Sequence, residues 1–345
     1  MTKTVAIVGA GIIGLFTGWW FARHGWQVRV YEQGSGYAQT SLSAAGALIP
    51  FDGLQNGAKQ RLQRQSLWQY PAIIPELEAD SGMCVQYRMC GRIRLLAADD
   101  VTRMERAVAK ASNWPVVQPA QMVGAGTGHA GLAEFPAHMR CVVSATLNPL
   151  RMLEALHKAI EKHGGAVLLE RKVRHLTDMV GDVRINTAGI WADGLTGVWL
   201  VPLKKQAVTL ETREPLDISM IVEDRHTYII PRAGGCQFYV GAHADPAAGI
   251  DFTSTPEVAN TLHAAAARLI PGLAQAQVVA RHVGVQPKTP AGRSMYLGAI
   301  PHEPDCFIAA GHGGVGFGMA PATADILLQL AEGRVPDVDI APFAL

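Results

Sequence analysis

The sequence has few cysteines, no run of basic residues and almost no net charge. Its 30 Lys and Arg residues are nearly balanced by 29 Asp and Glu residues, so the chain offers no electrostatic footprint for a nucleic acid. The five cysteines are widely spaced, with no C-x-x-C motif and no histidine pair at metal-ligand spacing. These absences predict a reduced, cytoplasmic protein with no bound metal and no nucleic-acid partner.

Long hydrophobic runs are also scarce, with one exception near the N-terminus. Residues 5–22, VAIVGAGIIGLFTGWWFA, are 18 consecutive uncharged residues, close to the length of a membrane span. The run contains four glycines, lacks a small-residue cleavage pattern and continues into the strand-like RHGWQVRVYE. We therefore predict no integral membrane span, and peripheral membrane association only if the protein is a dehydrogenase.

The same run carries a dinucleotide-binding pattern. A short β-rich segment precedes GAGIIG, in which Gly9, Gly11 and Gly14 have G-x-G-x-x-G spacing, and a helical segment and a second strand follow. Gly9 allows a tight turn, Gly11 lets the backbone approach a pyrophosphate, and Gly14 permits close helix packing. Glu32, at the end of the second strand, can accept hydrogen bonds from ribose hydroxyls and disfavours NADP. The predicted cofactor contacts of this unit also include Ile12, Ile13 and Gln33.

A loop of small residues, QTSLSAAGALIP, follows at residues 39–50. Thr40 and Ser41 offer hydroxyl groups, and Gly46 marks a turn. Small side chains would let a broad isoalloxazine ring lie against the backbone, which favours FAD over NAD. A plain flexible loop explains the composition equally well. The predicted contacts here are Thr40, Ser41, Ala44, Ala45 and Gly46.

Together with later segments, these motifs resemble the FAD-dependent D-amino-acid oxidase superfamily, and especially glycine oxidase and D-amino-acid dehydrogenase. The resemblance rests on VAIVGAGIIG, VYE, TSLSAAGALIP, LNPLRMLEALHKAIEKHGG, NTAGIWADGL, YIIPR, GHGGVGFGMAPATADIL and the closing APF, in that order. It implies an α/β fold with a Rossmann-like FAD-binding domain, interleaved with a substrate domain on a mixed, largely antiparallel sheet. We expect the FAD-binding domain at residues 1–80, 141–200 and 292–345, and the substrate-binding domain at 81–140 and 201–291.

The resemblance also implies which later segments contact FAD. The backbone at Val173 would meet the adenine, and Ala188 and Gly189 would approach the cofactor closely, whereas Trp191 either covers the flavin or packs in the core. The glycine-rich loop before the helix expected at about 320–331 would place N–H groups near the pyrimidine end of the flavin. Its predicted contacts are Gly313, Gly314, Val315 and Gly316. No residue matches a known attachment site, so we predict non-covalent FAD.

The substrate end departs from the family pattern. Tyr228 matches the family tyrosine that reaches over the flavin, and His243 and Ala244 lie where relatives place a pocket wall. Where relatives usually have an arginine that holds the substrate carboxylate, in G-x-R-P-x-T-P-D-G, this chain has GVQPKTPAG and therefore Gln286. The loop arginine of glycine oxidase corresponds to Gly314, so neither familiar cation is present.

Three explanations for the missing arginine stay open. The substrate has an amide, an ester or no carboxylate; or another cation replaces the arginine, such as Lys288, Arg88 or Arg140; or the catalytic role has changed. Because a neutral amide cannot match an arginine–carboxylate pair, simple glycine-like substrates should bind poorly.

These observations predict an FAD-dependent amine or amino-acid oxidase or dehydrogenase. Hydride would pass from the C–H bond next to the amine nitrogen to flavin N5, and the resulting imine would hydrolyse. Tyr228 and Gln286 are the predicted catalytic residues, and His243, Ala244 and Gly314 the predicted substrate contacts. The electron acceptor is oxygen, a quinone or a carrier protein, and a homo-oligomer is one option. The alternatives are an FAD-dependent hydroxy-acid dehydrogenase and a flavoprotein accessory subunit with an altered pocket.

Overall fold

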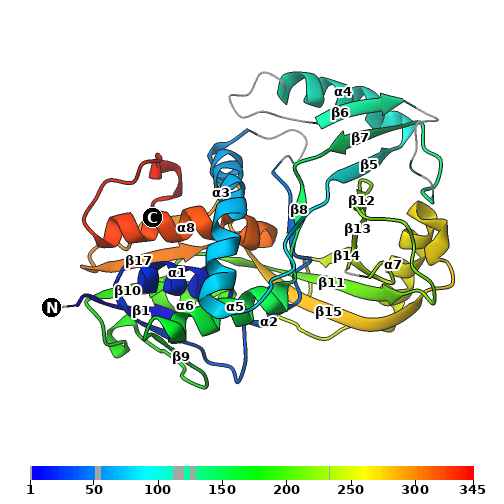
Figure 1. The fold of residues 1–345 in the computed structure, drawn as a ribbon. Helices are drawn as coiled ribbons and strands as arrows, with labels where there is room; N and C mark the ends of the chain where they lie inside the picture. Colours follow the sequence, from blue (N-terminus) through cyan, green and yellow to red (C-terminus); the bar gives the residue numbers. More distant parts are fainter. Residues whose placement is uncertain (1, 51–55, 112–119, 125–128, 130, 233) are drawn as a thin grey trace.

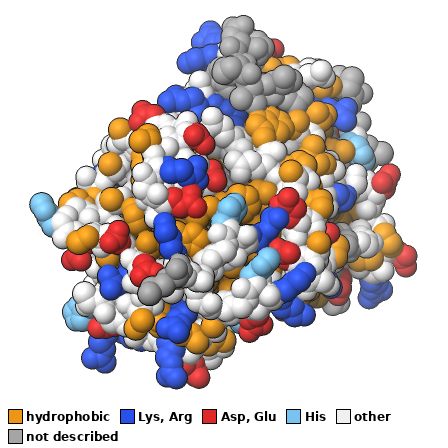
Figure 2. Space-filling view, turned by 60° about the vertical axis from the view of Figure 1, so that its left-hand side comes forward, with side chains coloured by type: hydrophobic (Ala, Val, Ile, Leu, Met, Phe, Trp, Pro, Cys, Tyr) orange, Lys and Arg blue, Asp and Glu red, His pale blue; other side chains and the backbone are white. Residues whose placement is uncertain are grey.

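A computed structural model of the chain describes residues 2–50, 56–111, 120–124, 129, 131–232 and 234–345. Two large sheets dominate the structure, and the helices pack around them (Figure 1). The predicted fold class, an α/β protein with a Rossmann-like sheet and a second, largely antiparallel sheet, is confirmed. Side chains of both charge signs are interspersed over the face seen in Figure 2.

The first sheet has six strands and begins with the predicted β-α-β unit. Its order is β16 (Tyr296–Ala299), β17 (Cys306–Ala310), β10 (Val183–Asn186), β1 (Thr4–Val8), β2 (Gln27–Tyr31) and β9 (Ala166–Leu168). All neighbouring strands are parallel except β16 and β17. The carboxyl ends of parallel strands are the usual place for a ligand in such a sheet.

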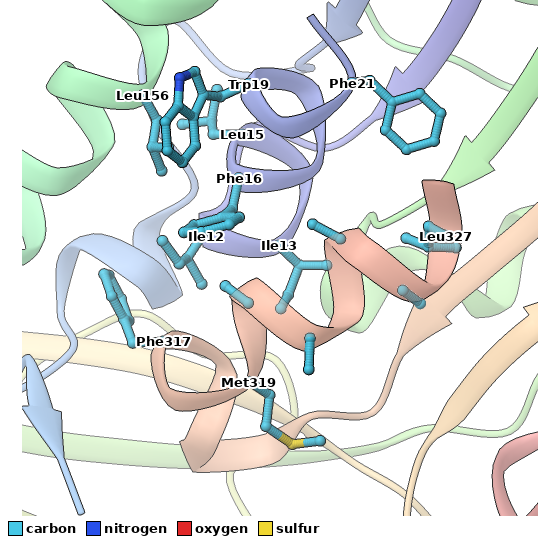
Figure 3. Packing of buried hydrophobic residues seen from close by; sticks show 14 of the residues in the cluster. Ile12, Ile13, Leu15, Phe16, Trp19, Phe21, Leu156, Phe317, Met319 and Leu327 are labelled. Atoms are coloured by element: carbon cyan, nitrogen blue, oxygen red, sulfur yellow. The ribbon is translucent and has the colours of Figure 1, made fainter. Parts of the chain in front are cut away.

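Helices α1 (Ile12–Arg23), α3 (Ala58–Ser81), α5 (Pro149–Lys162) and α8 (Gly316–Ala331) share one apolar core with this sheet. The core includes Ile13, which lies between α1 and α8 in Figure 3, and the fully buried Trp19 of α1. The uncharged run at residues 5–22 is therefore a buried strand, a glycine turn and a buried helix. No helix in the described part of the chain has the length and apolar composition needed to span a membrane.

The second sheet has eight strands and is antiparallel except for the β12–β5 pair. Its order is β15 (Gln277–Lys288), β11 (Val201–Glu211), β14 (Gln237–Asp245), β13 (Tyr228–Pro231), β12 (Ile221–Glu223), β5 (Arg92–Leu96), β7 (Ala137–Cys141) and β6 (Ala120–Gly124). Helix α7 (Pro256–Leu269) packs on one face, and α4 (Ala98–Ala111) lies near the β6 edge. The domain boundaries predicted from the sequence stay a prediction.

A small three-stranded sheet, β3 (Ala47–Leu48), β8 (Ala145–Thr146) and β4 (Arg88–Met89), stands between the two large ones (Figure 1). The short helices are α2 (Gln39–Leu42), α6 (Asp193–Thr196), η1 (Leu176–Asp178), η2 (Gly189–Trp191), η3 (Pro271–Leu273), η4 (Gly313–Val315) and η5 (Ala341–Phe343). Of these short helices, α2, α6, η2 and η4 contribute residues to the same cavity.

Two local expectations needed correction. The β-rich composition of GAVLLERKVRHL, residues 165–176, predicts one strand, but β9 ends at Leu168, because Glu170 adopts a left-handed conformation with φ of 54° and turns the chain. The last long helix begins at Gly316 rather than near residue 320, directly after η4.

Candidate active site

The turn between β1 and α1 explains two of the three motif glycines in steric terms. Gly9 has a φ of +106°, and a Cβ there would lie 2.6 Å from the carbonyl oxygen of Thr187. A Cβ on Gly14 would lie 1.9 Å from the carbonyl oxygen of Gly9, so only glycine allows α1 to approach the strand this closely. At Gly11 the nearest atom to an added Cβ is the Ser41 Oγ, at 3.2 Å.

Glu32 lies at the carboxyl end of β2 and is buried. Its carboxylate accepts hydrogen bonds from the backbone N–H groups of Ala10, at 2.8 Å, and Gly34, at 2.9 Å. These bonds fix the carboxylate beside the glycine turn, and a carboxylate has about four acceptor sites. Two sites therefore stay available for the ribose hydroxyls predicted to bind there.

The small-residue loop is held by hydrogen bonds to both β15 and the start of α1, and is not a plain flexible loop. Thr40 Oγ1 donates to the carbonyl of Val285 at 2.9 Å and accepts from its N–H at 3.2 Å. The Ser41 hydroxyl accepts from the N–H of Ile12 at 3.0 Å, at the N-terminus of α1. The predicted loop contacts therefore already have protein partners that hold α2 between α1 and β15.

A cavity of about 930 Å³ lies where these elements meet. Its lining combines the glycine turn, the end of β2, the α2 loop, the η2 segment and the glycine-rich loop before α8. Of the predicted FAD contacts, it includes Gly9, Gly11, Ile12, Ile13, Glu32, Gln33, Thr40, Ser41, Val173, Ala188, Gly189, Trp191, Gly313 and Gly316. Segments that are far apart in the sequence therefore line the same cavity.

Six predicted FAD contacts do not line this cavity. Gly14 faces the Gly9 carbonyl, and Gly46, with φ of +69°, is confined because a Cβ would lie 2.2 Å from the carbonyl oxygen of Leu147. Ala44 packs against the core of the six-stranded sheet, and Ala45 packs against a small cluster of the eight-stranded sheet that includes Ile230 and Tyr239. The other two, Gly314 and Val315, belong to η4. Their contribution to the site stays a prediction.

The donor groups along this cavity fit FAD. Gly11, Ile12 and Ile13 at the N-terminus of α1 line the cavity, and a helix N-terminus is a favourable place for a pyrophosphate. Glu32 suits a ribose, and the glycines of the loop before α8 leave its backbone accessible to a planar ring. When bound there, FAD would supply the capacity to accept a hydride.

Two residues that the sequence reasoning missed hold the glycine-rich loop. His312 is buried, its Nε2 lies 3.2 Å from Thr323 Oγ1, and burial together with the nearby Lys59 lowers its pKa to about 3. Lys59 Nζ donates to the carbonyls of Ser294, Gly311 and His312 at 2.9, 3.2 and 3.1 Å. Burial, with a contribution from Lys288, lowers the pKa of Lys59 to about 8. No local sequence signal links Lys59 to a loop 250 positions later.

Tyr228 lies on β13, and its ring crosses the neighbouring strand. A Cβ at Gly241 would lie 2.4 Å from the Tyr228 hydroxyl oxygen, so the ring occupies the space that a side chain at 241 would need. The Tyr228 ring stacks near Tyr239, with centroids 6.3 Å apart. Burial raises the pKa of Tyr228 to about 12, so its hydroxyl stays protonated and can donate a hydrogen bond at neutral pH.

Gln286 lies on β15 against the glycine-rich loop. A Cβ at Gly314 would lie 2.9 Å from the Gln286 Nε2, and one at Gly313 would lie 3.5 Å from the Lys288 Nζ. The two positions where relatives were expected to carry an arginine are therefore neighbours in space. A side chain at 314 would therefore require the end of the Gln286 side chain to move.

The strand register places His243 and Ala244 on opposite faces of the eight-stranded sheet. His243 pairs with Gln206, whose side chain bonds Thr255 at the start of α7, whereas Ala244 pairs with Lys205 on the next position. Directly opposed residues share a face of a sheet, and adjacent residues alternate. His243 is therefore on the α7 face, and Ala244 is on the opposite face, which carries Tyr228.

The alternative cations lie in different places. Lys288 is beside Gly313, as described. Arg140 is on β7, near the opposite end of the eight-stranded sheet, with only β6 beyond it. Arg88 lines a separate cavity of about 460 Å³ together with Arg232, whose guanidinium lies over the Tyr239 ring with 5.3 Å to its centroid.

Comparisons with known proteins agree with this geometry. The family model described as FAD dependent oxidoreductase matches residues 4–330. Glycine oxidase from Pseudomonas aeruginosa is 30% identical over 365 residues, covering 100% of this chain and 99% of that protein.

Two solved structures share the fold. The crystal structure of glycine oxidase from Geobacillus kaustophilus has a TM-score of 0.91 at 26% identity and covers 100% of this chain and 99% of its own. Iminodiacetate oxidase from Chelativorans sp. BNC1 has a TM-score of 0.85 at 21% identity, covering 99% and 98% of the two chains. Because the family model spans nearly the whole sequence, the chain belongs to the FAD dependent oxidoreductase family.

Proposed function

We propose that this enzyme oxidises a small amine or amino-acid derivative at the C–H bond next to the amine nitrogen. The chemistry that bound FAD supplies is acceptance of the hydride, and water then hydrolyses the imine to a carbonyl compound. The observation that carries the proposal is the position of Gln286 against Gly314, which brings the substrate face of the eight-stranded sheet to the loop lining the cofactor cavity.

The residues of the chain act mainly by positioning. Tyr228 keeps its proton at neutral pH, so its hydroxyl can donate to a substrate carboxylate or to an ordered water. The Gln286 amide offers two further donors. Hydride removal from an amine needs alignment and an unprotonated nitrogen more than a strong base, so these oriented donors match the requirement.

The N–H groups of the loop before α8 and the start of that helix produce a positive potential beside the cavity. Negative charge is stabilised at such a place. Lys59 adds to this effect by fixing the carbonyls of Gly311 and His312, so that the loop keeps one conformation. The proposal includes non-covalent FAD, and oxygen, a quinone or a carrier protein as the acceptor.

Product analysis tests the proposal. Purified holoenzyme is incubated with small amines and amino acids, and the solution is assayed for the deaminated or dealkylated carbonyl product and for hydrogen peroxide. We expect a carbonyl product in proportion to substrate consumed, with peroxide if oxygen is the acceptor. Turnover of 2-hydroxy acids without turnover of any amine would refute the proposal.

A further inference from the structure

Lys205 points toward the substrate side of the eight-stranded sheet. Its neighbours on β11 both point to the other side, where Lys204 Nζ donates to Asp251 at 2.5 Å and Gln206 Oε1 accepts from the Thr255 N–H at 2.8 Å. Because adjacent side chains of a strand alternate between faces, Lys205 is directed away from α7. That is the face on which Tyr228 lies.

The two residues directly opposite Lys205 have little or no side chain. They are Gly284 on β15 and Ala244 on β14. The segment that follows α2 covers Gly284, since a Cβ there would lie 2.3 Å from the Ser43 Oγ, whereas Ala244 presents a single methyl group. Gln286 is two residues along from Gly284 and shares its face. The sheet register therefore places an ammonium group, an amide and a small residue next to one another on one surface.

The charge of Lys205 has no oppositely charged partner among the described residues. Lys205 is partly buried and forms no ion pair with any residue that the structure describes. Burial is the main cause that lowers its pKa, and the nearby positive charge of Lys288 adds to it. A partly buried ammonium without a carboxylate is an unfavourable arrangement for the protein alone and a favourable one for an anionic ligand.

We propose that Lys205 binds the carboxylate of an amino-acid substrate and so replaces the arginine missing at Gln286. The Gln286 amide and the Tyr228 hydroxyl then donate further hydrogen bonds to the same carboxylate. The substrate class is an amine with a free carboxylate, rather than an amide, an ester or a simple amine. This inference rests on the proposed function, because it describes the substrate end of the same site.

A carboxylate that has no amine group can bind at the site but cannot undergo the proposed oxidation, so it measures binding alone. Holoenzyme is titrated with sodium acetate and sodium propionate at constant ionic strength, and the change in flavin absorbance gives the Kd. The variants are Lys205→Met, Lys205→Gln and Lys205→Arg, with Lys158→Met as a matched control, since Lys158 is an exposed lysine on α5.

We expect Lys205→Met and Lys205→Gln to raise the Kd at least about tenfold, the loss of one charged hydrogen bond. Lys205→Arg should stay within about threefold of the wild type because it keeps the charge, and Lys158→Met should have no effect. An unchanged Kd in both neutral variants, or no saturable change with either carboxylate in the wild type, would overturn the inference.

The two experiments distinguish a failure of the Lys205 inference from a failure of the proposed reaction. If acetate binding depends on Lys205 but no amine reduces the flavin, the substrate-end inference stands and the proposed reaction fails. If amino acids and their amides reduce the flavin equally well in the wild type and in Lys205→Met, the reaction stands and the role of Lys205 is refuted.

Discussion

The Tyr228 ring can lie across the sheet only because residue 241 has no side chain. An alanine there would place its Cβ 2.4 Å from the Tyr228 hydroxyl oxygen, and an ordered ring in a packed sheet cannot yield by that amount without moving. The orientation of a candidate catalytic group thus depends on a glycine of another strand.

Gly241→Ala should therefore lower kcat about tenfold or more by displacing Tyr228, without loss of FAD. Steady-state kinetics and the flavin-to-protein ratio measure the two effects. Gly124→Ala is the matched control, since a Cβ at Gly124 meets no atom of the described residues within 4 Å. A wild-type kcat in Gly241→Ala would mean that the hydroxyl position is unimportant.

Gln286→Arg should improve the binding of small amino acids. The variant adds a planar cation to the face shared with Tyr228, and an arginine–carboxylate pair is stronger than an amide–carboxylate one. We expect KM to fall about tenfold in an amino-acid assay, and the double variant Lys205→Met/Gln286→Arg to retain that affinity. Unchanged KM and kcat in Gln286→Arg would place residue 286 outside the site.

Among the structural elements, the start of α1 is the one most directly tied to cofactor binding. Gly11 lines the cavity between the glycine turn and α2. A valine there would occupy the approach of a pyrophosphate, so Gly11→Val should lose most of its FAD during purification. Absorbance gives the flavin content, and circular dichroism shows whether the fold persists. A folded Gly11→Val protein that stays fully yellow would contradict the assignment of this turn.

The loop before α8 should make the protein sensitive to acid. Because His312 has a pKa of about 3 instead of 6.5, the unfolded chain binds the proton more readily, and stability is lost as pH falls below 6.5. Between pH 6.5 and pH 5 the loss should be about 2 kcal/mol. Denaturant unfolding of His312→Gln should show a smaller loss, whereas His226→Gln, which removes an exposed histidine, should follow the wild type.

Sequence reasoning succeeded where the relevant contacts are local. The glycine spacing, the strand before it and Glu32 lie within 30 residues, and they predicted the β1–α1–β2 unit and the cofactor family, which is confirmed. Asn148 and Pro149 likewise marked the start of α5, where the Asn148 side chain accepts from the Arg151 N–H. Such signals need no knowledge of the rest of the fold.

The sequence alone could not decide which residues share a face where strand register sets the answer. Whether residue 243, 244 or 205 faces the substrate depends on the pairing of β11 with β14 and β15, and on the extra residue at Ala242 that interrupts it. A shift of one position exchanges the two faces. For that reason nothing in the sequence pointed to Lys205, and nothing pointed to Lys59, because the three carbonyls that Lys59 binds are far away in the sequence.

Taken as one unit, the chain joins its two sheets through β15, which bonds to Thr40 by its backbone and contacts the α8 loop through Gln286. In the proposed site, the cavity that fits FAD and the substrate face of the eight-stranded sheet are therefore adjacent. The chain is similar to glycine oxidases over its full length, and we propose that Lys205, rather than an arginine, supplies the charge at the substrate end.

Anaerobic reduction of the flavin tests the central claim most directly. Holoenzyme is mixed without oxygen with matched pairs of small amino acids, their amides and the corresponding 2-hydroxy acids, and the loss of flavin absorbance is followed. We expect bleaching by at least one amino acid, faster than by its amide, and none by the hydroxy acids. Bleaching by hydroxy acids alone, or by none of the compounds, would contradict that claim.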